Sequence, residues 1–257
     1  MLCDAHCHPF DLERIFPGAE EERRRLGIFC AASAADPGEF EYNEGLAAAG
    51  PPLLCCYAVH PQLPAARGNC SESLDALDAL ARAGRLDAVG ETGFDLYNAA
   101  FRLTEKLQDE LFTLHLETAL RYGLPLVLHV RRAMHKVFAR AADLKKCRAL
   151  IFHSWPGTAG EGEALLRRGI NAFFSFGTAI LLNHREAIRC CAAFPAERVL
   201  SETDAPFQAL RGRACSTWGD LPAVLGAMAE LRGGAKPAEL EGQIEKNFRG
   251  AFCGGKD

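Results

Sequence analysis

Short apolar runs alternate with longer amphipathic stretches along the whole chain, and this rhythm restricts the possible folds more than any other feature of the sequence. The runs are rich in small and β-branched residues, as strands are, and they cover residues 2–5, 28–31, 53–59, 88–90, 126–130, 149–152, 171–175 and 199–200. The stretches between them have helical spacing and cover residues 11–26, 36–49, 71–83, 101–121, 133–145, 159–168, 182–194, 221–232 and 237–252. Strands that alternate with helices predict βαβ units and therefore a parallel sheet.

Eight such units in 257 residues predict a closed α/β barrel. We expect a distorted (β/α)₈ TIM barrel that forms a single domain over residues 1–257. The rival fold, an open doubly wound sheet, usually has fewer strands and a glycine-rich phosphate loop after the first strand. No G-x-G-x-x-G motif stands at that place, so the barrel is favoured.

Two helical stretches allow finer expectations about which side chains are buried. In the stretch 101–121 the spacing places one apolar face on Leu103, Leu107, Leu111, Leu114 and Ala119. In the stretch 11–26 the run Arg23, Arg24 and Arg25 follows three glutamates, a pattern typical of a solvated helix face with i,i+3 and i,i+4 pairs.

Composition and charge exclude several classes of protein. Hydrophobic residues make up 49% of the chain and charged residues 24%, which excludes global disorder. The formal net charge of −4 excludes a protein that holds nucleic acid by bulk positive charge alone. No apolar run approaches the roughly 18 residues that span a bilayer, and the first ten residues lack the pattern of a signal peptide. Eleven cysteines without a C-x-x-C motif are typical of the reducing cytoplasm.

Side chains that can bind metal stand at the ends of the expected strands. The segments concerned are DAHCH at residues 4–8, GETGFD at 90–95, HVR at 129–131, HSW at 153–155 and SETDAP at 201–206. In a barrel these ends surround one mouth, which is where barrel enzymes have their active sites. Chance would scatter such residues among the helices and the opposite face.

The first of these segments has a geometry of its own. Because side chains alternate along a strand, Asp4, His6 and His8 should face one way and Cys7 the other. Two imidazoles two residues apart can chelate one cation, although a lone H-x-H pair is as compatible with two unrelated histidines.

The carboxylates and the remaining histidines each have a plainer alternative. Glu91 follows an apolar run and would be costly to bury unless paired or metal-bound; the alternative is a salt bridge, for example to Arg131. Asp95 is better explained as a helix cap or turn residue. His129 and His153 could each be structural, and Asp204, before a proline, could form an Asx-turn.

Taken together, four histidines and two carboxylates form a mixed nitrogen and oxygen ligand set: His6, His8, Glu91, His129, His153 and Asp204. Such a set suits zinc, manganese or iron and, with added waters, magnesium. Since this is more ligands than one four-coordinate ion needs, we expect two divalent cations that share Glu91. No G-x-S-x-G motif is present, so water is the expected nucleophile and Asp204 its general base.

The strings DAHCHPF, GETGFDLYN, LPLVLHVRRA, HSWPGT and SETDAPF resemble, in order and spacing, the TatD family of metal-dependent deoxyribonucleases. The resemblance runs from residue 2 to the terminal KNFRGAF. It implies a cytoplasmic hydrolase that cleaves DNA, from single-stranded 3′ ends, with two divalent cations such as Mg, Mn or Zn. It places one ion on His6, His8, Glu91 and Asp204, and the other on Glu91, His129 and His153. His60, in the family's His-Pro motif, is then a candidate contact for a substrate phosphate.

Other positions depart from the family pattern without touching these ligands. Arg132 stands where an acidic residue is common, and Phe94 where leucine is usual. Ser154 and Trp155 replace a Cys-aromatic pair, and Ala214 and Cys215 replace the expected continuation after Arg211-Gly212-Arg213.

Arginines at the mouth are candidate phosphate contacts, chiefly Arg131 and Arg211, with salt bridges as the alternative for Arg213. Trp155 could stack on a base or serve in packing. We expect a monomer without a membrane or protein partner.

Two other functions remain open. The same barrel could hydrolyse a small amide, lactone or phosphoester, although such sites often bridge their metals with a carboxylated lysine where this chain has Glu91. A scaffold with a purely structural metal is less consistent with six ligands at an open mouth.

Overall fold

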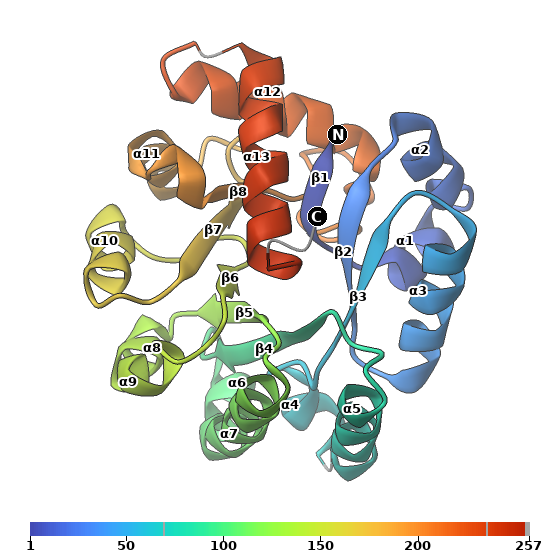
Figure 1. Cartoon of the computed structure of the whole chain (residues 1–257), viewed down its shortest axis with the longest axis vertical. Coiled ribbons are helices and arrows are strands. Elements are labelled where there is room, and N and C mark those ends of the chain that lie inside the picture. Colours follow the sequence, from blue (N-terminus) through green and yellow to red (C-terminus); the bar gives the residue numbers. More distant parts are fainter. Residues whose placement is uncertain (69, 235, 255–257) are drawn as a thin grey trace.

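Eight parallel strands follow one another in chain order around the fold (Figure 1). The computed structural model describes residues 1–68, 70–234 and 236–254, so the end of the expected domain, residues 255–257, lies outside the description. The strands are β1 (Cys3–Cys7), β2 (Phe29–Ala34), β3 (Leu53–Tyr57), β4 (Ala88–Asp95), β5 (Leu126–Arg131), β6 (Leu150–Phe152), β7 (Ala172–Phe176) and β8 (Val199–Ser201). The predicted (β/α)₈ barrel is therefore confirmed.

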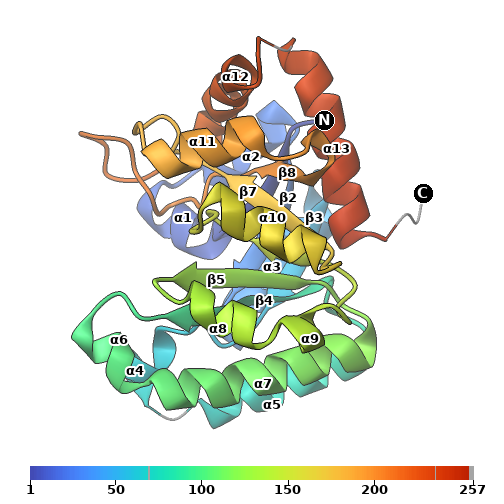
Figure 2. The ribbon, with the colours of Figure 1, turned by 90° about the vertical axis from the view of Figure 1, so that its left-hand side faces the viewer.

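Helices form an outer layer around these strands (Figures 1 and 2). They are α1 (Pro9–Ile15), α2 (Ala19–Leu26), α3 (Pro37–Ala49), α4 (Leu63–Arg67), α5 (Ser71–Arg82), α6 (Ala99–Leu103), α7 (Glu105–Tyr122), α8 (Met134–Ala139), α9 (Ala141–Leu144), α10 (Ala159–Arg167), α11 (Arg185–Ala193), α12 (Leu221–Leu231) and α13 (Pro237–Phe252), with short 3₁₀ turns η1 (Ala196–Arg198) and η2 (Trp218–Asp220). Among the described residues, none of these helices has the length and apolar character needed to cross a membrane.

The seam between β8 and β1 is joined by polar groups. The Asp4 carboxylate accepts hydrogen bonds from the backbone N–H and the hydroxyl of Thr203, at 3.0 and 2.6 Å. The backbone N–H of Asp204 donates to the carbonyl of His6 at 3.0 Å, and that of His8 donates to Ala205 at 2.7 Å. Burial raises the pKa of Asp4 to about 7. These bonds fix the segment after β8 directly beside His6 and His8.

Strand β4 extends further than the apolar run predicts, because its polar end is satisfied inside the protein. The hydroxyl of Thr92 lies 3.0 Å from Nδ1 of His115, and the backbone N–H of Asp95 donates to Gln108 at 2.8 Å. Both partners belong to α7, which packs against β4. Glu91 therefore lies within a strand that is buried on all sides, not beyond its end.

Several helical expectations are wrong in detail. Pro17 and Gly18 divide the stretch 11–26 into α1 and α2, a break at Thr104 divides 101–121 into α6 and α7, and a turn at Arg140 divides 133–145 into α8 and α9. Since α6 ends at Leu103, that side chain leaves the expected face and is 87% exposed; Leu114 is also exposed.

The expectation for Arg23 is also wrong, because its side chain is buried rather than solvated. Its guanidinium pairs with Glu20 and donates to the carbonyls of Ile28 and Pro51, so it connects α2 to the starts of two strands.

Candidate metal centre

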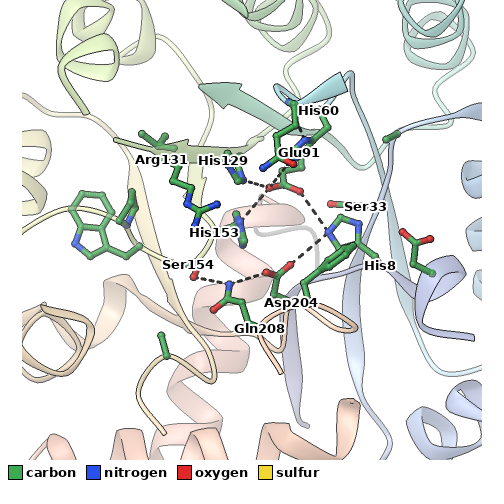
Figure 3. A pocket seen from close by; sticks show the side chains of 18 of the residues that line it. His8, Ser33, His60, Glu91, His129, Arg131, His153, Ser154, Asp204 and Gln208 are labelled. Atoms are coloured by element: carbon green, nitrogen blue, oxygen red, sulfur yellow. Dashed lines mark hydrogen bonds and ion pairs between the residues drawn. The ribbon is translucent and has the colours of Figure 1, made fainter. Parts of the chain in front are cut away.

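A pocket of about 860 Å³ opens at the carboxyl ends of the strands, and five of the predicted ligand side chains line it: His8, Glu91, His129, His153 and Asp204 (Figure 3). His6 is fully buried beside Glu91. His6 lies on β1 and His8 directly follows that strand, while Glu91 lies on β4 and His129 on β5. His153 and Asp204 follow β6 and β8, so residues far apart in the sequence converge because parallel strands end on the same side of the barrel.

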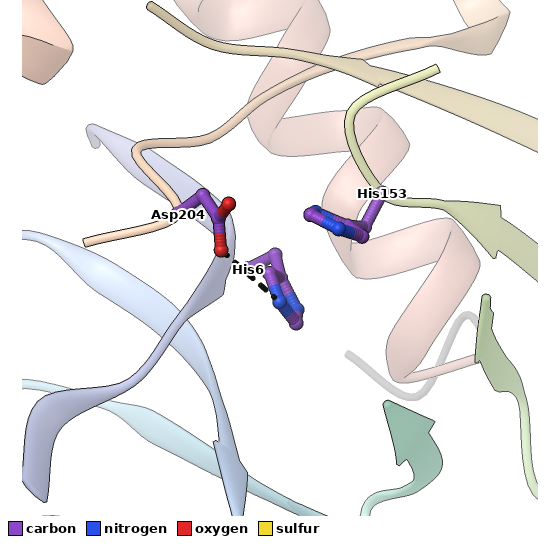
Figure 4. A group of neighbouring side chains, drawn as sticks. All are labelled: His6, His153 and Asp204. Carbon is purple, nitrogen blue, oxygen red and sulfur yellow. Dashed lines mark ion pairs between the residues drawn. The ribbon is translucent and has the colours of Figure 1, made fainter. Parts of the chain in front are cut away.

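One half of the site forms around Oε2 of Glu91. Nε2 of His6 lies 3.2 Å from this oxygen and Nε2 of His8 lies 3.5 Å from it. The same two nitrogens lie 3.5 and 3.6 Å from Oδ1 of Asp204. Figure 4 shows Asp204 directed toward His6, with His153 on the other side of that ring. These four side chains present their ligand atoms to one common point.

The other half forms around Oε1 of Glu91. Nδ1 of His129 lies 2.7 Å from this oxygen, and Nε2 of His153 lies 3.2 Å from it. His60, which the sequence suggested only as a substrate contact, also points here, with Nε2 at 3.3 Å. Two oxygens of one carboxylate thus face two separate sets of side chains.

Groups of ligand atoms that lie within 4.8 Å of one another recur at this site. In the described part of the chain they are His6, His153 and Asp204; His6, His8 and Glu91; and His60, Glu91 and His129. Cys7 is in none of them. Its thiol is buried 3.7 Å from the carbonyl of Ala31, on the side away from the pocket, as strand alternation predicts.

In three of the histidines, the ring nitrogen that does not face Glu91 contacts a second polar side chain. Nδ1 of His6 lies 3.2 Å from the Ser33 hydroxyl, and Nε2 of His129 lies 3.1 Å from the Asp95 carboxylate. Nδ1 of His153 lies 3.4 Å from Oε1 of Glu202, whose other oxygen accepts from Ser175; the amide of Gln208 donates to Oδ2 of Asp204 at 2.7 Å. Such contacts orient metal-binding imidazoles in proteins.

Sequence reasoning missed these supporting residues. Asp95 has the turn role that the sequence favours, since its Oδ1 accepts a hydrogen bond from the backbone N–H of Tyr97 at 2.9 Å. Its contact with His129 was not predicted, although the two residues lie on strands that are neighbours in a barrel. Glu202 stands two residues before Asp204, and no sequence pattern marks it as a neighbour of His153.

The electrostatics of the site are those of a carboxylate surrounded by imidazoles. Burial alone would favour the neutral acid, but His60, His6 and His153 hold the pKa of Glu91 well below its usual value. For Asp95, burial is likewise outweighed, and hydrogen bonds from His129 and Gln62 lower its pKa to about 2. Both groups are therefore anionic at neutral pH, the state in which carboxylates bind cations.

Gly93 permits the close contact of β4 and β5 that places His129. A Cβ atom at this position would lie 2.1 Å from the carbonyl oxygen of His129, and the φ of Gly93 is +137°. Only glycine avoids both the clash and the strained backbone.

Backbone strain is concentrated around the same mouth. Arg132, Ser154, Asp204 and Gln208 have φ values between +45° and +56°, a region that residues other than glycine rarely occupy. Strain of this kind often marks functional sites, where the surrounding structure enforces it.

The candidate substrate contacts differ in their position relative to the pocket. Arg131 lines the pocket. Trp155 also lines the pocket, but it is only 5% exposed and its ring packs against Phe152 and Phe174, which supports a packing role; stacking on a base stays a prediction. Arg211 is exposed outside the pocket lining, and Arg213 forms a salt bridge with Asp220; a phosphate contact by Arg211 stays a prediction.

An eight-stranded barrel that gathers imidazoles and carboxylates at the carboxyl ends of its strands has the architecture of a metal-dependent hydrolase. The chain belongs to the family of TatD-related DNases, whose sequence model matches residues 3–253. This match confirms the resemblance expected from the five motifs.

Individual relatives agree with this assignment. The "3′-5′ ssDNA/RNA exonuclease TatD" of Cronobacter sakazakii is 33% identical over 209 residues, which are 76% of this chain and 74% of the relative. The "uncharacterized metal-dependent hydrolase YjjV" of Escherichia coli is 29% identical over 227 residues, 82% and 83% of the two chains.

Solved structures extend the similarity to the whole fold. The crystal structure of YjjV, described as a TatD homologue, superposes with a TM-score of 0.85 at 25% identity and covers 98% of both chains. A TatD-family hydrolase from Entamoeba histolytica, with a TM-score of 0.78 at 14% identity over 98% and 97% of the chains, shows the same fold.

Proposed function

We propose that the protein hydrolyses phosphodiester bonds of single-stranded nucleic acid, cleaving DNA from its 3′ end, with water activated by two divalent cations. The observation that carries the proposal is the position of Glu91, whose two oxygens face separate sets of ligand atoms. Membership of the family supports it, and the names of the relatives supply the substrate class and the direction of cleavage.

The donor set fits a pair of divalent cations. His6, His8 and Asp204 would hold one together with Oε2 of Glu91, and His129 and His153 would hold the other together with Oε1. Nitrogen and oxygen donors in this mixture suit Zn and Mn, or Mg with additional waters. When bound, such cations lower the pKa of water and stabilise negative charge on phosphate oxygens.

Asp204 is the residue to which we assign proton transfer. Its Oδ1 faces His6 and His8, while Oδ2 is held by the amide of Gln208. Although burial opposes ionisation, His153, His8 and His6 lower the pKa of Asp204. The carboxylate is therefore ionised and can accept a proton from water, with its orientation fixed by the amide of Gln208.

His60 has a different role from the other histidines. Its Nδ1 accepts a hydrogen bond from the backbone N–H of Gln62 at 3.2 Å, so in the neutral ring the proton is on Nε2. That N–H points toward Oε1 of Glu91 at 3.3 Å. A nitrogen that carries a proton cannot bind a metal, so we assign His60 as a hydrogen-bond donor to Glu91 or to a substrate phosphate.

The cysteines support a reducing compartment. All eleven are free thiols, and burial raises the pKa of Cys3, Cys55, Cys147 and Cys191 to about 12, so these thiols are poor nucleophiles. We propose a monomer that works in the cytoplasm.

The test compares substrates under one set of conditions. The metal-loaded protein is incubated with oligonucleotides labelled at the 5′ or the 3′ end, and in parallel with amide, lactone and small phosphoester substrates. We expect stepwise shortening of the 5′-labelled strand, prevented by a chelator and by Asp204→Asn. Hydrolysis of a lactone or an amide without cleavage of DNA would contradict the proposal and favour the alternative of a small substrate.

Asp11→Asn is the matched control for the Asp204 variant. Asp11 also lines the pocket, but its carboxylate pairs with Arg14 at 3.8 Å and belongs to none of the ligand groups. Its loss should leave cleavage unchanged.

A further inference from the structure

Three guanidinium groups gather around one short loop at the edge of the pocket. Arg102 and Arg132 each donate to the backbone carbonyl of Tyr97 at 3.3 Å, and Arg102 also donates to Leu96 at 3.2 Å. The guanidinium of Arg131 lies 3.6 Å from the centre of the Tyr97 ring and that of Arg132 lies 4.7 Å from it. Both arginines are thus positioned by one aromatic ring through cation–π contact.

These cations are not neutralised by the protein. Across residues 1–68, 70–234 and 236–254, no carboxylate lies within ion-pair distance of Arg102, Arg131 or Arg132. The carboxylate nearest to Tyr97 in sequence, Asp95, is occupied by His129, Gln62 and the backbone of Tyr97. An exposed group of arginines held in place without counter-charges fits an external anion.

The three arginines lie closer to the pocket mouth than the proposed metal ligands. Arg131 follows His129 by two residues on β5, which is about 6.6 Å along a strand. It lines the pocket beside His129 and across it from His8 (Figure 3). Arg132, the next residue, has a φ of +56°, and its side chain is exposed at the rim.

The opposite rim has the opposite charge. Glu39 of α3 lines the pocket on the side of His8, whereas the carboxylate of Asp11 on α1 is paired with Arg14 at 3.8 Å. A polyanion that reaches the ligands would be repelled there and attracted at the edge formed by β4 and β5.

We propose that Arg131 and Arg132, held by Tyr97, form a subsite that binds the backbone phosphate of the nucleotide adjacent to the one being hydrolysed. This inference rests on the proposed function and adds the path of the strand, which leaves the pocket over the β4–β5 edge. Arg132 stands where the family commonly has an acidic residue. With arginine at this position the chain should bind polynucleotides more tightly than with an acidic residue there.

Substrates with and without a second phosphate test the subsite. The metal-loaded enzyme is assayed on a single-stranded oligodeoxynucleotide and on the p-nitrophenyl ester of thymidine 5′-monophosphate, which has one phosphodiester only. Arg132→Gln should raise KM about tenfold for the oligonucleotide and leave the nitrophenyl ester unchanged. Tyr97→Leu should act in the same direction with a smaller effect, because both arginines remain but lose their positioning.

Salt dependence distinguishes a phosphate contact from a structural role. For a phosphorothioate oligonucleotide, which is cleaved slowly, the slope of log Kd against log salt concentration should become shallower by about 0.7 in Arg132→Gln. Arg132→Lys should restore the slope because it keeps the charge. Arg167→Gln on α10 is the matched control: it removes the same charge from an exposed residue paired with Glu163.

The outcomes separate the two proposals. Equal losses on both substrates, or an unchanged salt slope in Arg132→Gln, would overturn the subsite. Oligonucleotide binding that depends on Arg132 without cleavage of either substrate would support the subsite and contradict the proposed function.

Discussion

Replacement of Glu91 by glutamine tests whether one carboxylate serves two cations. Its oxygens lie between 2.7 and 3.5 Å from imidazole nitrogens on both sides of the site. At a metal concentration 100 times the Kd, each bound ion stabilises the folded state by about 2.7 kcal/mol. For a chain of this size that corresponds to a rise in Tm of about 5–11 °C per ion, or about 10–20 °C for two.

An amide can offer only one weaker oxygen and turns an NH₂ group toward the other half of the site. Glu91→Gln should therefore lose most of the metal-dependent rise in Tm, because neither half keeps its carboxylate charge.

The assay is thermal unfolding of wild type and variant, each with chelator and with added Zn or Mn. Asp11→Asn, which removes a carboxylate from the same pocket but not from the ligand groups, should keep the full rise. A Glu91→Gln protein whose Tm still rises by the wild-type amount would refute the assignment of Glu91 as the shared ligand.

Three further predictions concern the stability of the barrel and its dependence on pH and metal. Gly93→Ala should destabilise the fold by about 1–3 kcal/mol in denaturant titrations and reduce turnover, because its Cβ meets the carbonyl of His129; wild-type behaviour would show that the two strands can separate at no cost. His115 accepts a hydrogen bond from Val59, and burial lowers its pKa from 6.5 to about 4. Below pH 6.5 the unfolded chain therefore takes up a proton at His115 that the folded chain does not. Neutral His115 thus contributes about 3 kcal/mol to the free energy of unfolding above pH 6.5, and this contribution is lost as the pH falls toward 4. In His115→Gln this part of the pH dependence of stability should disappear, and a pH profile unchanged from wild type would contradict the prediction. Chelation should abolish hydrolysis without unfolding the barrel, as measured by circular dichroism, whereas loss of the helical signal would indicate a structural metal.

The barrel could be predicted from the sequence because its strands are short, apolar and regularly separated by helices. Each expected run overlaps an observed strand, and Pro237–Phe252 is the helix that the spacing predicts. The errors lie where a local pattern meets a tertiary contact. The apolar run at residues 88–90 gives no sign that β4 continues to Asp95, since α7 supplies the partners that make its polar end tolerable.

The convergence of the proposed ligand side chains could be predicted for a related reason: in a parallel barrel the sequence position at the end of a strand specifies a place in space. The supporting residues could not be predicted, because their roles depend on which strands are neighbours and on side-chain geometry. Ser33 contacts His6 from the next strand, and Gln208 reaches Asp204 from the following loop. Neither residue type carries a pattern of its own.

Burial of long polar and aromatic side chains was the least predictable property. Arg23 stands in a run of charges that predicts solvent, yet three carbonyls and Glu20 surround its guanidinium. Trp155 follows a candidate ligand but turns into an aromatic cluster with Phe174 and Phe194.

The most direct test of the account is a crystal structure of the metal-loaded protein with anomalous data collected at the absorption edge of the metal. We predict two anomalous peaks, one on each side of the Glu91 carboxylate, the first beside His6 and His8 and the second beside His129 and His153. A single peak, or two peaks that Glu91 does not join, would contradict the shared-ligand centre.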